Sequence, residues 1–561
     1  MEAEEGGAGH QPAPVGGAEL RQQRLAKLAK LRERGIEPFA SRFDRTHTAH
    51  QAIGLFEEAE RRVSGPVAEY PVQEEVRTDP VSVAGRVTRH RSQGKVAFAD
   101  IVDGSGKLQL YARADRLGPE AMELFNDLDL GDIVGALGEL FRTRRGEISV
   151  DVQSLKLLTK SLRPLPDKWH GLKDPETRFR QRHLDLIANP QARDTLRLRS
   201  RMIAHIRRFL DERGFEEVET PVLHRIAGGA AARPFVTHHN ALDMDLYLRI
   251  ALELHLKRLV VGGIERVYEI GRVFRNEGID AVHNPEFTML ELYQAYTDLV
   301  GMMQLTEALV KGIAEAVGKG GSFDYQGQTI EVSRPWKRRE MLDLVREANP
   351  GVDLDDVEAL RLRADALGAI PRDRDWGELI FEIFERSVER SLVQPTFVTG
   401  HPVSVSPLAR RRTEDVRLAD RFELFIAGKE MGNAFSELTD PVDQRARFEQ
   451  QVAARGAGDD EAHPMDADFI AALEQGMPPT GGLGIGIDRM VMLFADVTHI
   501  REVIAFPAMR DASSDASVGD ASVGDATVGD APAGDDATAG DATAGDVPVT
   551  GDAPPAPDIE T

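Results

Sequence analysis

The segment from residue 274 to residue 287 carries side chains suited to binding a nucleoside triphosphate. Arg275 offers a fork of donors that fits a phosphate, and Glu277 offers an acceptor for a neighbouring amine. On a strand these two side chains project from the same face, because strand side chains alternate with a period of two. A short turn then leads into a second predicted strand, which carries His283 and Phe287. We predict a hairpin that stacks a base on Phe287 and holds a phosphate on Arg275.

Taken alone, the Arg-x-Glu triplet favours a plainer interpretation, namely an exposed hairpin with a salt bridge. The nucleotide interpretation depends on polar side chains far away in the chain. Glu253 lies where a predicted strand gives way to a helix, so its carboxylate would sit near a helix start and face a pocket. A surface helix cap would use the same residue.

The segment from 422 to 437 places several polar side chains among Phe, Leu and Ile, namely Glu423, Glu430, Asn433 and Glu437. Carboxylates in such surroundings are costly unless a cation compensates them. A magnesium ion or an ammonium group would do so, and magnesium commonly bridges carboxylates and substrate phosphates. The alternative is an amphipathic strand with its acidic face in water.

A glycine-rich run at 481–486 precedes Arg489, which lies at the start of a predicted helix with an apolar stripe. Glycines let the backbone approach a ligand closely. The spacing matches neither the Rossmann nor the P-loop pattern, so the run alone is a weak signal. The segment from Gly214 to Pro221 follows a predicted helix at 197–213 and, by itself, indicates an ordinary junction between a helix and a strand.

The composition is that of a soluble globular protein with two or three domains, because 561 residues are too many for one core. The chain has no apolar run long enough to span a membrane and no cysteine. Disulfides and thiolate metal sites are therefore excluded. Residues 1–18 predict a disordered leader without the pattern of a secretory signal, so we expect a cytoplasmic protein.

The net charge of −24 is unevenly distributed. The segment 511–561 holds twelve acidic residues and no Lys or Arg, so the remaining chain carries −12 together with all 69 basic residues. Overall charge thus neither supports nor excludes an RNA partner. The segment repeats an Ala-Ser/Thr-Val/Ala-Gly-Asp pentad and predicts a disordered acidic tail, since a calcium-binding roll needs a nine-residue period.

The N-terminal part predicts a helix at 18–34 and then five short alternating strands between 81 and 158, with a helical stretch at 119–128. The basic helix either touches RNA or docks by its leucine stripe. The strands fit a small Greek-key barrel of the oligonucleotide-binding type. Phe98 and Gln109 are the candidates for contacting single-stranded nucleic acid, although Phe98 would equally fill the barrel.

These patterns give a domain prediction. Residues 1–18 form the leader, 19–165 the N-terminal helix and barrel, 166–510 a larger domain of helices and strands, and 511–561 the tail. Within the larger domain, residues 306–394 predict a mostly helical insertion without site-like patterns.

In chain order, the segments resemble the three signature motifs of the class II aminoacyl-tRNA synthetases, and most closely the lysyl-tRNA synthetase family. The sequence is most similar to that of the family at Arg233 to Asp243 (RPFVTHHNALD), Val267 to Glu277 (VYEIGRVFRNE) and Asn433 to Pro441 (NAFSELTDP). The likeness extends from about residue 20 to residue 510. It implies an α+β fold, with a five-stranded OB-fold anticodon-binding barrel followed by a catalytic domain whose antiparallel sheet of six to seven strands is flanked by helices.

The resemblance also implies roles for individual residues. Arg275 and Arg489 would be catalytic, holding the α-phosphate and the γ-phosphate side of ATP. The other assignments are ATP binding by Glu277, His283 and Phe287, lysine binding by Gly229, Glu253, Tyr293, Asn433 and Glu437, magnesium binding by Glu423 and Glu430, and anticodon binding by Phe98 and Gln109. Mg²⁺ is the implied cofactor and ATP a co-substrate. The implied partners are L-lysine, tRNA-Lys and a second copy joined partly through 214–221, without membrane or DNA.

The chain departs from the family's usual wording near Glu253. The family commonly has Ala-Pro-Glu and then Tyr, whereas this chain has Leu252 and His255, and Ala227 replaces a larger residue or proline. Loss of the proline frees the backbone, which predicts weaker lysine affinity. We expect activation of lysine and its transfer to tRNA. The alternative is a divergent paralogue that binds RNA or regulates, with little or no aminoacylation.

Overall fold

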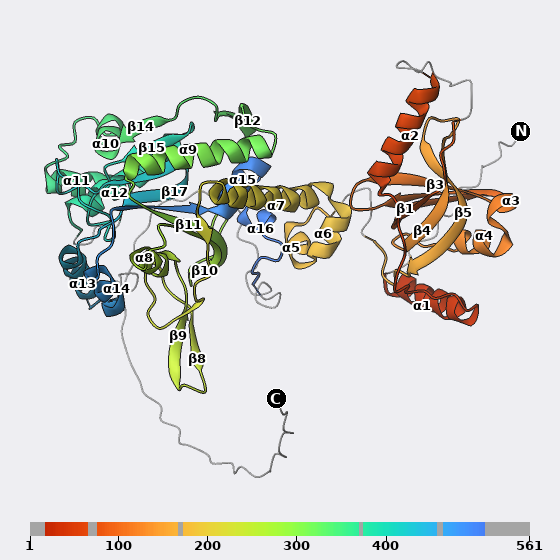
Figure 1. Cartoon of the computed structure of the whole chain (residues 1–561), viewed down its shortest axis with the longest axis horizontal. Helices are drawn as coiled ribbons and strands as arrows, with labels where there is room; N and C mark the ends of the chain where they lie inside the picture. The colour runs from red at the N-terminus through yellow and green to blue at the C-terminus, as the bar shows by residue number, and fades with distance from the viewer. Residues whose placement is uncertain (1–16, 65–75, 166–171, 370–373, 457–463, 511–561) are drawn as a thin grey trace, which may run out of the picture. The chain divides into compact units, whose positions relative to one another are not determined.

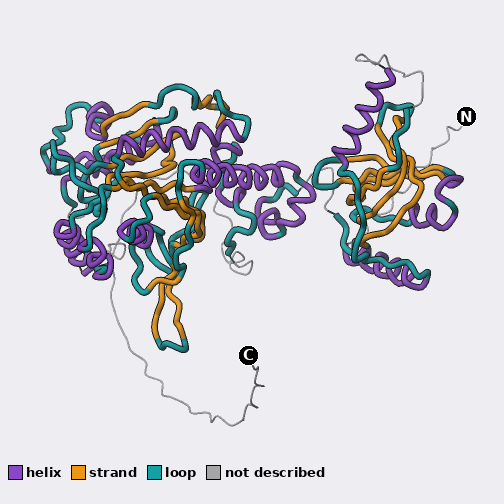
Figure 2. Tube along the Cα trace, viewed as in Figure 1, coloured by secondary structure: helices purple, strands orange, loops and turns teal. Residues whose placement is uncertain are grey.

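The structure, a computed structural model, describes residues 17–64, 76–165, 172–369, 374–456 and 464–510 (Figures 1 and 2). The predicted acidic tail at 511–561 lies outside these residues, as does the predicted leader up to residue 16. The first helix begins at Gly17, one residue before the predicted start.

Five strands of the N-terminal part close into a barrel in the order β1-β2-β3-β5-β4. Short alternating runs with buried residues such as Val83, Ala97 and Leu110 fill its interior. One short helix, α4, occupies the predicted helical stretch at 119–128, and α3 precedes it. The bounds are β1 (Val81–Gln93), β2 (Val96–Val102), β3 (Lys107–Arg113), α3 (Ala114–Leu117), α4 (Pro119–Asn126), β4 (Ile133–Arg142) and β5 (Ile148–Thr159). The predicted OB-type barrel is confirmed.

Two helices accompany the barrel. In α1 (Gly17–Glu33), Leu28 and Leu31 are buried, and the Arg24 guanidinium donates to the carbonyls of Leu130 at 3.0 Å and Arg163 at 2.8 Å. Of the two interpretations of this helix, the structure therefore shows docking by the leucine stripe. The second helix, α2 (Ala49–Ser64), was not predicted from the sequence and buries Phe56 completely.

The larger domain is built on an eight-stranded sheet in the order β14-β15-β16-β17-β18-β11-β10-β6. Its inner strands are antiparallel, and only the edge pairs β14·β15 and β10·β6 are parallel. These two short edge strands raise the count above the predicted six to seven. The bounds are β6 (Glu216–Glu217), β10 (Arg266–Phe274), β11 (Glu286–Ala295), β14 (Lys337–Glu340), β15 (Thr396–Thr399), β16 (Arg421–Ile426), β17 (Lys429–Ser436) and β18 (Thr480–Gly486).

The two faces of this sheet are used differently because side chains alternate along each strand. On one face Leu290, Leu292, Leu483 and Ile485 pack against three helices, α7 (Pro190–Asp211), α9 (Leu299–Ala316) and α15 (Ile487–Ala495). Figure 1 shows α7 and α9 side by side along the sheet. The opposite face holds a second core with α8 (Glu253–Val261), α13 (Pro441–Gly456) and α14 (Ala467–Glu474). The predicted antiparallel sheet flanked by helices is confirmed.

The predicted insertion at 306–394 contains strands as well as helices. After the end of α9 it forms a hairpin and then a helical group whose own core packs Ile380, Ile383 and Phe384 beside Phe425 of the sheet. The elements are β12 (Ser322–Tyr325), β13 (Gln328–Glu331), β14, α10 (Met341–Ala348), α11 (Val357–Ala366), α12 (Trp376–Ser387) and the 3₁₀ turn η1 (Glu389–Ser391).

A three-stranded sheet of order β7-β9-β8 follows the Gly214–Pro221 segment. Its strands and the remaining helices are β7 (Leu223–His224), β8 (Val236–His239), β9 (Met244–Leu248), α5 (Pro175–Arg180), α6 (Arg182–Ala188) and α16 (Ile500–Val503). Among the helices that the structure describes, none is both long and apolar enough to cross a membrane.

Candidate active site

The strand register places three predicted site residues, Glu423, Asn433 and Tyr293, in two rows on the face of the large sheet opposite α7, α9 and α15. Neighbouring strands are about 4.8 Å apart, so each row is a line of side chains at that spacing. The rows consist of Glu423, Asn433, Gly484 and Glu291, and of Arg421, Phe435, Gly482 and Tyr293. A cavity of about 630 Å³ opens above them, and all eight residues line it.

The glycine run forms part of the cavity floor. Gly482, Gly484 and Gly486 face the cavity because Leu483 and Ile485 point into the core on the other side. A Cβ atom at position 482 would collide with the Glu437 carboxylate and lie 2.6 Å from the Tyr293 ring. The glycine run therefore leaves space for Glu437 and Tyr293, two predicted lysine-binding residues. This space explains the glycine pattern, which was a weak signal on its own.

The predicted hairpin around Arg275 is partly wrong. β10 ends at Phe274 and β11 begins at Glu286, so Arg275, Glu277 and His283 lie in the intervening loop. The Asp280 carboxylate accepts the N–H groups of Val282 and His283, each at 2.7 Å, and folds this loop into a local turn. Such side-chain turns compete with strand pairing.

The predicted phosphate and base contacts are nevertheless neighbours. The Arg275 guanidinium lies 5.2 Å from the centre of the Phe287 ring, and its Nε donates to the carbonyl of Ile250 at 3.4 Å. Phe287 is on β11, as predicted, and faces the cavity. Glu277 also lines the cavity.

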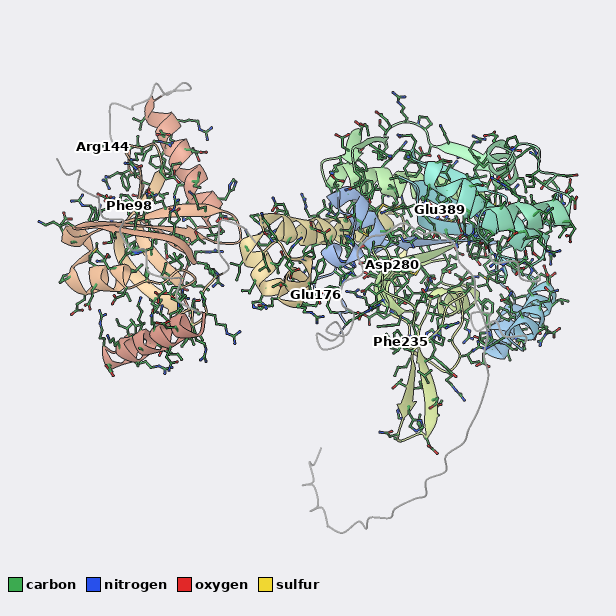
Figure 3. The ribbon with its side chains drawn as sticks, turned by 180° about the vertical axis from the view of Figure 1, so that it is seen from behind. Phe98, Arg144, Glu176, Phe235, Asp280 and Glu389 are labelled. Carbon is green, nitrogen blue, oxygen red and sulfur yellow. The ribbon has the colours of Figure 1, made fainter. Side chains whose placement is uncertain are left out.

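Arg489 joins this end of the cavity from α15. Its Nη1 donates to the backbone carbonyl and the carboxylate of Glu430, both at 3.2 Å, and its Nη2 lies 3.2 Å from Nε2 of His283. The other ring nitrogen of His283 lies 2.8 Å from the Asp280 carboxylate, which fixes the ring (Figure 3 labels Asp280). Two predicted ATP-binding residues more than two hundred positions apart are thus in contact.

The two predicted magnesium ligands lie in different electrostatic surroundings. Burial alone would raise the pKa of Glu423, but His401 at 3.4 Å and Arg421 at 2.6 Å outweigh it and lower that pKa to about 2. Burial and the charge of Glu423 raise the pKa of Glu430. Arg421 also donates to Oδ1 of Asn433 at 2.9 Å, which occupies that amide oxygen.

This pair fits a hard cation. Burial and the facing Glu423 carboxylate raise the pKa of Glu430 although three arginines oppose the shift, so a bound cation would favour its ionised form. No group of three or more His, Asp or Glu residues is placed to hold a metal within the described parts of the chain. A magnesium ion would take one or two protein carboxylates and complete its shell with phosphate oxygens and water, which is its usual arrangement in nucleotide enzymes.

The predicted lysine-binding residues meet at the other end of the rows. Glu253 is the first residue of α8 and is buried, and Gly229 adopts φ +91° against it, where a Cβ would lie 3.3 Å from that of Glu253. Tyr293 is buried, and its hydroxyl donates to Oε2 of Glu291 at 3.3 Å. Glu437 follows β17, and its Oε1 accepts no hydrogen bond from the residues that the structure describes.

Two residues of this group were missed in the sequence. Glu291 is buried on β11, two positions before Tyr293, and the alternation that placed Phe287 in the cavity would have placed it there too. Lys257 lies four residues after Glu253, so the two share a helix face. Its Nζ is 2.5 Å from Oε1 of Glu253 and is also ion-paired with Glu437.

Burial controls the protonation of these acids. Burial and the neighbouring Glu253 raise the pKa of Glu291 to about 7. Burial raises the pKa of Glu437 to about 8, although Lys257 opposes the shift. The free cavity therefore holds protons at neutral pH that a bound ammonium group would displace.

The family departures do not loosen the backbone here. Leu252 is fully buried, and its N–H, which a proline would lack, donates to Oε1 of Glu291 at 3.0 Å. The ring of His255 lies 4.5 Å from that of His224, and burial lowers the pKa of both, that of His224 to about 4. Two neighbouring tilted imidazole rings thus take the place of the expected tyrosine.

The insertion contributes to the cavity, which was not expected from its sequence. Glu378 and Phe381 of α12 line the cavity wall. Farther along this helix, burial and the nearby Glu389 and Glu423 raise the pKa of Glu385 to about 7 (Figure 3 labels Glu389). A further carboxyl group with a raised pKa therefore lies near Glu423.

In the barrel, Phe98 lies on β2 between the inward-facing Ala97 and Ala99, so it does not fill the interior (Figure 3). Its half-buried ring is 5.0 Å from that of Tyr111. Gln109 is buried, and Ser149 donates to its Oε1 at 2.8 Å. The roles of these residues in binding nucleic acid stay predictions.

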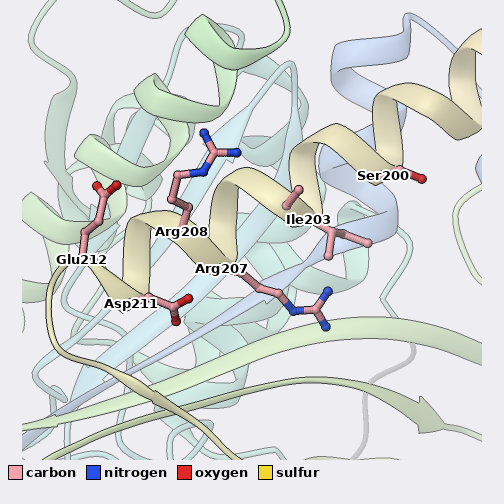
Figure 4. Close-up of a pocket in the computed structure, with 7 residues that line it drawn as sticks. Ser200, Ile203, Arg207, Arg208, Asp211 and Glu212 are labelled. Atoms are coloured by element: carbon pink, nitrogen blue, oxygen red, sulfur yellow. The ribbon is translucent and has the colours of Figure 1, made fainter.

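A second hollow, of about 620 Å³, follows α7 (Figure 4). It is lined from a single helix by Ser200, Ile203, Ala204, Arg207, Arg208, Asp211 and Glu212. Side chains from other elements do not line it, so we assign it no chemistry.

Comparisons with known proteins agree with this arrangement. Residues 174–510 match the family described as tRNA synthetases class II (D, K and N), and residues 81–158 match the OB-fold nucleic acid binding domain. The chain is 55% identical over 497 residues to the lysine–tRNA ligase of Carboxydothermus hydrogenoformans, covering 88% of this chain and 98% of that protein. It is 54% identical over 491 residues to the lysine–tRNA ligase of Enterococcus faecalis, covering 87% and 96%.

Proposed function

The chain belongs to the class II tRNA synthetases and, within them, to the lysine–tRNA ligases, and we propose that the cavity above its large sheet is where it works. The protein is a ligase that activates L-lysine with ATP and transfers it to tRNA in protein biosynthesis. The observation that carries the assignment of the cavity is the meeting of three buried carboxylates, those of Glu253, Glu291 and Glu437, beside Arg275.

Lysine binds at the acidic end of the cavity. Its α-ammonium group pairs with Glu253 beside Gly229, and its ε-ammonium group is received by Glu437 together with Glu291. Oε1 of Glu437 supports this placement, because a buried carboxylate oxygen without a hydrogen bond is costly until a donor reaches it. Tyr293 and Asn433 flank the aliphatic part of the substrate.

ATP binds at the other end, with adenine on Phe287 and its α-phosphate on Arg275. Glu277 and His283 contact the nucleotide, and Arg489 exchanges its contact with Glu430 for the γ-phosphate side. A carboxylate oxygen of lysine attacks the α-phosphorus, the bond to the bridging oxygen breaks, and pyrophosphate leaves. A hydroxyl of the terminal ribose of tRNA then attacks the carbonyl carbon of lysyl-adenylate, and AMP leaves. The protein accelerates both steps by positioning and by fixed positive charge.

Glu423 and Glu430 hold Mg²⁺, which neutralises charge on the phosphates. The lowered pKa of Glu423 keeps that ligand ionised across the physiological range. Glu430 is less acidic, so binding of the cation there displaces a proton at lower pH.

The barrel reads the anticodon of tRNA-Lys. Phe98 stacks on a base, and the amide nitrogen of Gln109, whose oxygen is already used by Ser149, is free to donate to a base edge. Stacking with edge hydrogen bonds suits a single-stranded loop. We place the protein in the cytoplasm, where translation takes place. The alternative of a non-catalytic paralogue gains no support.

Two copies associate through the region that follows Gly214. Leu223 is 46% exposed, Val236 60% and Leu242 65%, and all three belong to the β7-β9-β8 sheet or its hairpin turn (Figure 1). Large apolar side chains grouped on a protruding hairpin are typical of a surface covered by a partner.

The test is exchange of radiolabelled pyrophosphate into ATP. We expect exchange that requires L-lysine and Mg²⁺, and charging of tRNA-Lys in the same preparation. Reactions without amino acid, or with L-aspartate or L-asparagine in place of lysine, are the controls. Exchange stimulated equally by L-aspartate, or none with L-lysine, would contradict the proposal.

A further inference from the structure

Lys257 is a buried cation, 1% exposed, in contact with Glu253 of the cavity lining. It stands one turn after Glu253 on α8, so the helix aims both side chains at the same place. Its Nζ lies 2.5 Å from Oε1 of Glu253 and is ion-paired with Oε2 of Glu437. One protein ammonium group thus links the two carboxylates assigned to the two ends of the substrate.

Aromatic rings enclose this ammonium group. Its Nζ lies 5.2 Å from the centre of the Phe435 ring and 5.9 Å from the centres of the Tyr293 and Phe469 rings. These rings attract a cation and keep water away from it. A buried ammonium group is unfavourable without partners, so its position is fixed by the carboxylates rather than by solvent.

The charges in this part of the cavity do not cancel. When all three carboxylates, of Glu253, Glu291 and Glu437, are ionised, they face one ammonium group, which leaves two negative charges; in the free protein at neutral pH, protons on Glu291 and Glu437 cover these charges. Free lysine at neutral pH carries two ammonium groups. Its carboxylate is left for Arg275, the remaining charged group that faces Glu291.

We propose that Lys257 is a positioning residue that holds Glu253 and Glu437 in place and sets the cavity at two uncompensated negative charges, one for each ammonium group of the substrate. This inference rests on the proposed function. Each of the two carboxylates keeps one oxygen for the substrate, because Lys257 occupies the other.

Removing the charge of Lys257 changes the protonation of the free enzyme. Burial holds the pKa of Glu291 at about 7 and that of Glu437 at about 8 even with the ammonium group present. Without it, the pKa of Glu437 rises further, because the ammonium group opposes that rise, and lysine must displace the Glu437 proton from this higher pKa to pair with the carboxylate. Each pH unit below the new pKa then costs about tenfold in apparent affinity.

The experiment compares Lys257→Met, Lys257→Gln and Lys257→Arg with the unchanged protein in lysine-dependent pyrophosphate exchange from pH 6.5 to 8.5. We expect Lys257→Met to raise KM for lysine about thirtyfold or more at pH 7 and KM for ATP less than about twofold. The excess in KM for lysine should shrink about threefold between pH 7 and pH 8.5, because Glu437 of the unchanged protein ionises near pH 8. Lys257→Arg should keep the pH profile of the unchanged protein, because it keeps the charge.

Lys257→Gln guards against a folding failure, because its amide can still donate to both carboxylates, and it should show the same pH-dependent loss. Lys311→Met is the matched control, since Lys311 forms an i, i+4 ion pair with Glu307 on α9 outside the cavity. An unchanged KM for lysine in Lys257→Gln, a rise that does not vary with pH, or an equal rise for ATP would overturn the inference. Absence of lysine-dependent exchange in the unchanged protein would instead overturn the proposed function.

Discussion

Replacing Glu291 by glutamine should make the protein more stable and a poorer enzyme at the same time. The amide keeps the size of the side chain, and its oxygen still accepts the N–H of Leu252, which lies 3.0 Å from Oε1. The substitution therefore removes the charge with little change in packing. It also removes the ionisation that burial makes unfavourable in the free cavity.

The size of the stability effect follows from the pKa. Burial raises the pKa of Glu291 from the ordinary 4.5 to about 7. Between these values the unfolded chain ionises while the folded chain stays protonated, so the free energy of unfolding falls by about 1.4 kcal/mol per pH unit. The loss reaches about 3 kcal/mol at pH 7 and is constant above it. Glu291→Gln escapes this loss, so without lysine it should melt at a higher temperature than the unchanged protein at pH 8.

The catalytic effect has the opposite sign. Loss of one buried partner of an ammonium group costs about 3 kcal/mol, or roughly a hundredfold in kcat/KM for lysine. Because lysine binds the ionised carboxylate, KM for lysine in the unchanged protein should fall about tenfold between pH 6 and pH 8 through Glu291. In Glu291→Gln, the slope of log KM for lysine against pH should be smaller by about one unit below pH 7, because one fewer proton is displaced.

Thermal melts with and without lysine, and pyrophosphate exchange across this pH range, measure both effects. Glu269→Gln is the matched control, because Glu269 pairs with Glu291 in the strand register but forms its ion pair with Arg249 at 2.6 Å. Glu269→Gln should be less stable than the unchanged protein and should keep its slope of log KM for lysine against pH. If Glu291→Gln has the slope of the unchanged protein, or melts at a lower temperature than it at pH 8, then the reasoning from burial is wrong.

Three further predictions concern other parts of the molecule. Glu437→Gln should raise KM for lysine about a hundred- to a thousandfold in pyrophosphate exchange and leave KM for ATP nearly unchanged; an equal loss for both substrates would refute its assignment to lysine. Phe98→Ala should raise KM for tRNA in aminoacylation about tenfold or more, through lost stacking, with no change in pyrophosphate exchange. Leu223→Asp should shift the protein from dimer to monomer in sedimentation velocity, whereas Val442→Asp, at a side chain that is 77% exposed outside this region, should not.

Local patterns predicted the parts of the fold that depend on short-range periodicity. The alternation of Val83, Ala97 and Leu110 identified barrel strands, and the leucine spacing of α1 identified a helix, whose docking only the structure shows. The loop from Arg275 to Pro285 was placed on strands because a period of two fits any short polar segment. The Asp280 side chain, which organises that loop, acts through hydrogen bonds that periodicity does not register.

The roles of Glu253 and Glu437 were implied only by the resemblance to the family, because either carboxylate alone also suited a helix cap or an acidic strand face; these roles stay predictions. The surroundings of Lys257 could not be predicted, because in the sequence it is an ordinary helix lysine. Only the fold shows that three rings and two carboxylates enclose it. The contribution of Phe381 to the cavity wall could not be predicted either, because the insertion reaches the cavity only through tertiary packing.

The alternation of side chains along β18 restricts insertions and deletions in this part of the chain. Moving that strand by a single residue would exchange its two faces. Leu483 and Ile485 would then project into the substrate space, and Gly482 and Gly484 would leave holes in the core. A one-codon insertion or deletion within 480–486 thus removes catalysis and stability together, whereas the loop before Thr480 has no such alternation; on the other side, α15 begins directly at Ile487. Length differences among functional descendants of this sequence should therefore lie outside this strand.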